Sequence, residues 1–322
     1  MEQIAQQRRD SVRGWMSRWP SWVGRLAAAS ALLYGVVVLT TAFAGSEHFI
    51  GFRFAVWPGA AVLLVGAAAA TATIVAGERA VSAPTIAVAL WTVAALTVAG
   101  SCWVLLSLIE LTLTGAVHDW AAFLERLALA GVGALFTATA LSWQRRSRGV
   151  CVRCGRAHGP GLSGRRYPEP HAAPIAVRRI AYAGCALFLP YLFLHTLGAL
   201  GVSGIEPDGF RPSWPMIAAG VVGVGLAVFL LLGLVRPWGM VFPRWTLWLA
   251  GRRVPRFLPL APVWLIAPTL ALYGTGGLVY GFFTEYGVVS LGGAASVAFG
   301  GYGWALCVAA VSYQIRTRPR CV

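Results

Sequence analysis

The amino-acid sequence predicts an all-α polytopic membrane protein with about eight transmembrane helices, organised as a tandem 4+4 parallel repeat. Three observations lead to this fold class: scarce charge, regularly spaced apolar runs, and motifs that recur in both halves. Hydrophobic residues make up 58% of the 322 residues and charged residues only 11%. A soluble domain carries about 25% charged residues because its surface faces water. Lipid is therefore the expected solvent for much of this chain.

Long apolar runs give the number of helices. Each is close to the ~20 residues that a helix needs to cross the hydrocarbon core of a bilayer. The runs cover residues 26–45, 56–77, 85–109, 123–143, 180–200, 214–235, 261–283 and 289–312.

The distribution of charge predicts the orientation. All basic residues are arginines, and they gather before helix one and after helices four, six and eight. The opposite loops hold most of the acidic residues, namely Glu47, Glu110, Asp119, Glu206, Asp208 and Glu285. This positive-inside pattern predicts a multi-pass protein of the plasma membrane with both termini in the cytoplasm. The net charge of +15 is thus mainly an orientation signal, and nucleic acid is not an expected partner.

Recurring motifs indicate an internal duplication. The matched pairs are Gly51-Phe52-Arg53 with Gly209-Phe210-Arg211, Gly100-Ser101 with Gly274-Thr275, and Ser142–Arg148 with Ser312–Arg318. If the last match is continued without a gap, Cys151 in the first half is aligned with Cys321 in the second. With four helices in each repeat, both halves enter the membrane from the same side, which predicts a parallel repeat.

The repeat divides the chain into five segments. They are a basic N-terminal segment 1–25, a first repeat 26–143, an Arg-rich cytoplasmic loop 144–179, a second repeat 180–312, and a tail 313–322. The first pair of motifs is separated by fewer positions than the second, so the second repeat has gained about 16 residues within 237–259. Aromatic residues followed by arginines predict that this insertion is a short helix in the inner headgroup layer. A membrane-hugging linker is the simpler alternative.

The strongest local motif is Cys151-Val152-Arg153-Cys154-Gly155, in the loop between the repeats. Two thiolates at this spacing, with His158 and His171 downstream, predict a structural Zn²⁺ site. Cys321 becomes a further candidate ligand if the tail folds back. A redox-active pair or an incidental pair in a flexible loop remain the alternatives.

A second group of candidates lies at the predicted outer face. Arg53 and Arg211 come from the repeated motif, and Glu110 and Glu285 end helices three and seven. These charges either rim a ligand-binding cavity between the halves or hold the outer loops in place. His195 is the single histidine within an apolar run, and it is either hydrogen-bonded structurally or a ligand.

The duplicated four-helix plan is similar to that of haem A synthases, in architecture only. Those enzymes place histidines in several helices of both halves, whereas this chain has only His195 within a span. The resemblance therefore does not extend to haem.

Three functions remain open from the sequence. The first is a transporter-like or permease-like component that passes a small or lipidic molecule between two four-helix halves. The second is a membrane-anchored sensor or assembly factor whose Cys/His loop binds zinc and a cytoplasmic protein. The third is an integral membrane enzyme acting on lipid, which is less expected because the sequence has no P-loop, Gly-x-Ser-x-Gly or His-Glu-x-x-His motif. Expected partners are the bilayer, a cytoplasmic protein or ATPase subunit, and a second copy of the chain.

Overall fold

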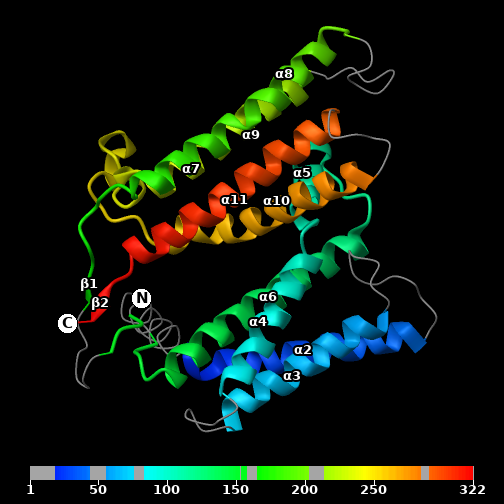
Figure 1. Cartoon of the computed structure of the whole chain (residues 1–322), viewed down its shortest axis with the longest axis vertical. Helices are drawn as coiled ribbons and strands as arrows, with labels where there is room; N and C mark the ends of the chain where they lie inside the picture. The colour runs from blue at the N-terminus through cyan, green and yellow to red at the C-terminus, as the bar shows by residue number, and fades with distance from the viewer. Residues whose placement is uncertain are drawn as a thin grey trace, which may run out of the picture. The chain divides into compact units, whose positions relative to one another are not determined.

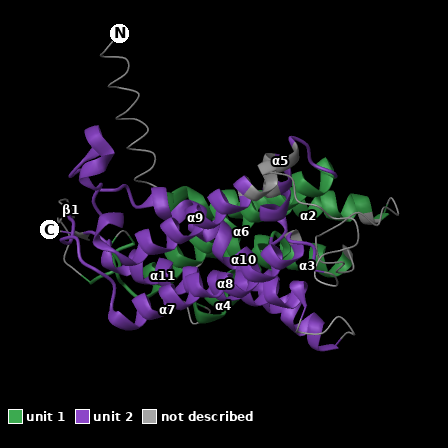
Figure 2. Ribbon diagram, turned by 90° about the horizontal axis from the view of Figure 1, so that it is seen from above, with its two compact units in different colours: residues 1–101, 119–162 green, residues 102–118, 163–322 purple. Residues whose placement is uncertain are grey.

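A computed structural model of the chain describes residues 19–43, 56–75, 83–152, 154–157, 165–202, 214–283 and 290–321. The chain divides into two compact units, coloured separately in Figure 2. Unit 1 comprises residues 1–101 and 119–162, and unit 2 comprises residues 102–118 and 163–322.

The described part of the chain is almost entirely helical (Figure 1). Seven of its helices are long and apolar enough to cross a membrane, as expected of a multi-pass membrane protein. The eighth predicted crossing corresponds to a 22-residue helix, Trp214–Val235. Its segment Gly220–Val235 is apolar, but this helix is not among the seven. An eighth crossing therefore stays a prediction.

The described residues of unit 1 form four helices, and each overlaps a predicted span. They are α2 (Trp19–Phe43), α3 (Val56–Val75), α4 (Ala83–Gly100) and α6 (Trp120–Ser147). Helix α2 packs on α3 and α6, and α4 packs on α6 and α3. The third predicted span, 85–109, is interrupted after Gly100, and its last part belongs to α5 (Val104–Thr114) in unit 2.

Small residues let the helices of unit 1 approach closely. A Cβ on Gly133 of α6 would lie 2.9 Å from Val98 Cγ2 and 3.3 Å from the Val98 backbone nitrogen of α4. Small residues at helix interfaces are the usual basis of packing in membranes, where apolar side chains gain nothing by leaving lipid. At the far end of α6, Trp143 is fully buried, and its Nε1 donates to the Ala83 carbonyl oxygen at 3.0 Å. Asp119 caps the beginning of α6 by accepting from the Ala122 N–H at 3.0 Å.

Unit 2 is built around one long helix. Its elements are α5, β1 (Arg165–Arg166), α7 (Ile175–Ala186), α8 (Phe188–Ala199), α9 (Trp214–Val235), η1 (Pro237–Gly239), η2 (Arg244–Leu249), α10 (Phe257–Phe283), α11 (Leu291–Arg316) and β2 (Arg320–Cys321). Helix α11 contacts α10, α7, α8 and α9. The fifth predicted span, 180–200, is split into α7 and α8 at Leu187. Pro190 accounts for the break, because it has no N–H to donate to the carbonyl of Ala186.

Glycines bring α10 and α11 together. A Cβ on Gly274 would lie 2.2 Å from Gly300 Cα, and one on Gly303 would lie 2.3 Å from the Ala271 nitrogen. Near the end of α11, the Tyr313 hydroxyl donates to the Gly239 carbonyl oxygen at 2.8 Å. The buried Arg316 donates to the carbonyls of His171, at 2.7 Å, and Leu234. Arg316 thereby fastens the segment before α7 and the last turn of α9 to α11.

The insertion of the second half folds differently from the expected short helix. Val241 and Arg253 form an antiparallel bridge, and the Phe242 N–H donates to the Arg252 carbonyl at 2.9 Å. The chain between these two bridged residues contains the 3₁₀ segment η2, which is kinked at Thr246 and at Leu247. The φ of Leu247 is 48°. The insertion is therefore a closed loop, and its tip exposes Trp245, Leu247 and Trp248.

Candidate metal centre

The end of α6 positions the Cys-x-x-Cys motif. The Gly149 N–H donates to the Arg146 carbonyl at 2.9 Å, and the Val150 N–H donates to the Arg145 carbonyl at 3.0 Å. This pair of bonds is the Schellman arrangement, which ends a helix with a glycine in the left-handed region. Gly149 has a φ of 66°. The chain therefore leaves α6 in a defined direction, and Cys151 follows two residues later.

A tight turn then brings the two cysteines onto one side of the chain. The Gly155 N–H donates to the Cys151 carbonyl at 2.6 Å, and the Cys151 N–H donates to the Arg156 carbonyl at 3.0 Å. Gly155 has a φ of 62°, a conformation that side-chain-bearing residues rarely adopt. The Arg145 guanidinium donates to the Val152 carbonyl and ties the turn to the end of α6. The glycine of the Cys-x-x-Cys-Gly motif is thus required by the turn itself.

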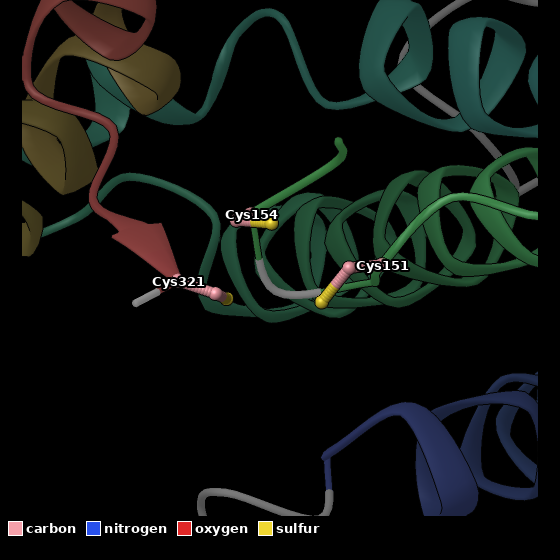
Figure 3. A group of neighbouring side chains, drawn as sticks. All are labelled: Cys151, Cys154 and Cys321. Carbon is pink, nitrogen blue, oxygen red and sulfur yellow. The ribbon is translucent and has the colours of Figure 1, made fainter. Parts of the chain in front are cut away.

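A third cysteine joins the pair. Strand β2 pairs antiparallel with β1, with Cys321 opposite Arg165, and this pairing folds the tail back. The Sγ atoms of Cys151, Cys154 and Cys321 all lie within 4.8 Å of one another. Figure 3 shows the three side chains as neighbours. Cys154 is buried, and the other two are partly exposed. The three thiols can hold a metal ion.

Zinc is compatible with this set of donors. Sulfurs bound to a tetrahedral Zn²⁺ at ~2.3 Å are about 3.8 Å apart. None of the three cysteines forms a disulfide. Soft thiolate donors favour zinc over magnesium or calcium. Three thiolates leave one position of a four-coordinate site to be filled by another ligand.

Of the two histidines predicted as metal ligands, the structure describes only His171. His158 lies outside the described residues. His171 is exposed, and its Nδ1 is 2.8 Å from the Glu169 carbonyl oxygen. The group of described metal-ligating side chains comprises the three cysteines and does not include His171. The role of either histidine as a ligand stays a prediction.

The predicted outer group is only partly described. Arg53, Arg211 and Glu285 lie outside the described residues. Glu110 in α5 accepts from the His118 N–H at 3.0 Å, a contact that closes the loop between α5 and α6. His195 in α8 has its Nε2 2.7 Å from the Tyr191 hydroxyl, and the two rings meet edge to face. His195 therefore makes a hydrogen bond within its own helix, and its use as a ligand stays a prediction.

Two features of the candidate sites could be seen only partly from the sequence. The pairing of β1 with β2 folds the tail back, whereas the sequence offered Cys321 as a ligand only on the condition that the tail does so. A basic cavity at the insertion, described below, had no sequence signal beyond its arginines. No protein-family model matches the chain, and no curated protein or solved structure matches it either.

Proposed function

We propose that this multi-pass membrane protein is a metal-dependent sensor or assembly factor. In this proposal, one structural Zn²⁺ fastens the C-terminal tail to the Cys-x-x-Cys turn on the cytoplasmic side. The observation that carries the proposal is the convergence of three sulfurs, of Cys151, Cys154 and Cys321, within 4.8 Å of one another.

The chemistry of the site favours a structural ion over a catalytic one. Catalytic zinc sites keep an open position for water or substrate, and their ligands are mostly histidines and carboxylates. Here all three donors are thiolates, and two of them come from a turn that glycine and backbone hydrogen bonds already fix. His158 and His171 are the predicted sources of the fourth ligand.

The same geometry suggests how metal occupancy becomes a signal. The tail beyond α11 is held by two elements, the β1–β2 pairing and the bond between Arg256 and Thr317. The paired strands are only two residues each, and isolated two-stranded pairs are marginal in water. Zinc would therefore decide whether the tail is held or released, and a cytoplasmic partner would recognise one of these two states.

The test is the metal content of the full chain, purified in detergent with a reductant and analysed by mass spectrometry. We expect about one zinc per chain in the wild type and almost none in Cys151→Ser, Cys154→Ser or Cys321→Ser. Cys307→Ser, in the middle of α11 and far along the chain from the motif, is the matched control and should keep its zinc. Wild-type protein without zinc, or an equal loss in Cys307→Ser, would exclude the proposal.

A second measurement separates sensing from the other functions. Proteins that co-purify with the wild type should be lost in Cys321→Ser or after treatment with a zinc chelator. In proteoliposomes, flux of a solute that is abolished by Arg53→Ala but not by Cys321→Ser would instead indicate the permease-like function. Turnover of a lipid without net transport would indicate an enzyme.

A further inference from the structure

A cavity of about 560 Å³ lies at the base of the insertion in unit 2. Its polar wall consists of Tyr167 just after β1, Arg253 and Arg256 from the end of the insertion, and Thr317 after α11. Met240 and Phe257 are among the residues of its apolar wall. A cavity of this size, mostly apolar and with a few convergent polar groups, is typical of a ligand site.

The polar wall carries positive charge without a carboxylate to balance it. Arg253 donates to the Pro168 carbonyl at 2.8 Å, and Arg256 donates to the Thr317 hydroxyl at 3.0 Å and the Gln314 carbonyl at 2.9 Å. Within the described part of the chain, neither arginine forms an ion pair. None of the residues that line the cavity is acidic; Glu169 follows the lining residue Pro168 in the sequence. Because each guanidinium has five N–H donors, both keep donors for a ligand.

The surroundings of Arg256 disfavour its own charge. Burial lowers the pKa of its guanidinium, and the neighbouring charge of Arg318 lowers it further. A bound anion would offset both effects. Planar guanidinium groups bind phosphate oxygens through paired, charge-assisted hydrogen bonds.

The tip of the insertion indicates where such an anion would come from. Trp245, Leu247 and Trp248 are 67%, 75% and 89% exposed, and arginines flank them on both sides. Aromatic side chains beside arginines are typical of segments that lie in the headgroup layer of an anionic membrane. The cavity at the base of the same loop is then within reach of phospholipid headgroups.

We infer that this cavity binds a phosphate group, held by Arg253 and Arg256, and that an anionic phospholipid is its carrier. The apolar wall would accommodate the glycerol and the first methylenes of the lipid, and the exposed tip would keep the loop in the headgroup layer. The site shares no residue with the proposed zinc site, although Arg256 and Thr317 of its wall also hold the tail that carries Cys321.

The inference can be tested by native mass spectrometry of the full chain in a zwitterionic detergent, titrated with phosphatidylglycerol. We expect one tightly held lipid in the wild type. Arg256→Gln and Arg253→Gln should each weaken it about tenfold or more, the usual effect of losing a charged hydrogen-bonding partner. Arg252→Gln is the matched control, because this neighbouring exposed arginine does not line the cavity, and it should bind within about twofold of the wild type. Arg253→Gln also covers the case in which Arg256→Gln fails to fold.

A second titration, with inorganic phosphate, distinguishes the source of the phosphate group. Retention of the lipid in the presence of excess phosphate supports the phospholipid. Binding of phosphate alone, weakened by Arg253→Gln but not by Arg252→Gln, supports the same site with a soluble ligand. Equal effects of Arg252→Gln and Arg253→Gln, or no binding of either ligand, would overturn the inference.

Discussion

Each unit contains a long helix, α6 in unit 1 and α11 in unit 2, whose first and last turns make comparable side-chain contacts. Asp119 and Ser290 cap the beginnings of α6 and α11, each accepting from a backbone N–H three residues later. Trp143 and Tyr313, 170 positions apart, lie near the ends of these helices. Each is buried and donates to a backbone carbonyl of its own unit, that of Ala83 at the beginning of α4 and that of Gly239 in η1. The duplication of a four-helix segment stays a prediction.

The arginines that follow show where the units differ. Arg146 and Arg316 each follow their aromatic residue by three positions, and each guanidinium carbon lies 5.8 Å from that ring's centre. Arg316, however, is only 8% exposed, and it donates to carbonyls before α7 and in α9. Arg146 remains partly exposed. Arg316 therefore connects three segments of unit 2 through hydrogen bonds, whereas the contact of Arg146 with Trp143 lies within α6.

The largest expected effect separates these two arginines. Arg316→Ala should lower the free energy of unfolding by about 3 kcal/mol, because it leaves buried carbonyls without a charged donor. Arg146→Ala should cost about 1 kcal/mol or less, chiefly through its contact with Trp143. Unfolding in mixed micelles, followed by tryptophan fluorescence, measures both. If both variants lost the same free energy of unfolding, Arg316 and Arg146 would contribute equally to stability, and the proposed difference between the two helix ends would be wrong.

The glycines of α6 and α11 provide a second comparison. Gly303→Ala should cost about 2 kcal/mol, since its Cβ would meet backbone atoms of Leu270 and Ala271. Gly133→Ala should cost about 1 kcal/mol, because its nearest obstacle is a methyl group of Val98 that can shift. Thermal unfolding in detergent measures both. Gly131→Ala, with nothing within 4 Å of the new Cβ, is the control and should be neutral or slightly stabilising. A larger cost for Gly133→Ala than for Gly303→Ala would contradict this order.

The smallest effect concerns the buried aromatic donors. Tyr313→Phe removes only the hydroxyl that donates to Gly239, and it should cost about 1 kcal/mol in the same unfolding measurement. Trp143→Phe removes the bond to Ala83 and some packing volume as well, so it should cost somewhat more. If Tyr313→Phe is neutral, the hydroxyl contributes nothing net to holding η1, and the parallel between the two aromatic residues is one of position only.

Helix positions could be predicted from the sequence because length and apolar composition determine where a chain can cross lipid. The interruptions within the predicted helices could be placed less accurately. Pro190 was visible as a possible kink, but the interruption falls at Leu187, where the missing N–H of proline takes effect. The insertion was predicted as one helix, yet it closes through backbone hydrogen bonds between Met240–Phe242 and Gly251–Val254, which leave no pattern in side chains.

The residues of the candidate sites could likewise be predicted only where they lie close together in the sequence. Cys151 and Cys154 could be selected because their spacing suits one metal ion, and the turn at Gly155 explains why that spacing works. Cys321 required knowledge that the tail folds back, which depends on the pairing of two very short strands. Arg253 and Arg256 were visible only as members of a basic segment, because a cavity depends on four stretches of chain that meet only in three dimensions.

The closed base of the insertion has a consequence for how this loop could have been acquired. Residues paired in an antiparallel bridge have Cα atoms only about 4.5–5.5 Å apart, so Val241 and Arg253 could be joined by a short turn without moving α9 or α10. The loop is in this sense a replaceable module, whose length and tip can change while the helices beneath it stay in place. A variant in which residues 243–251 are exchanged for a tight Asn-Gly turn would keep the scaffold and remove only the aromatic tip.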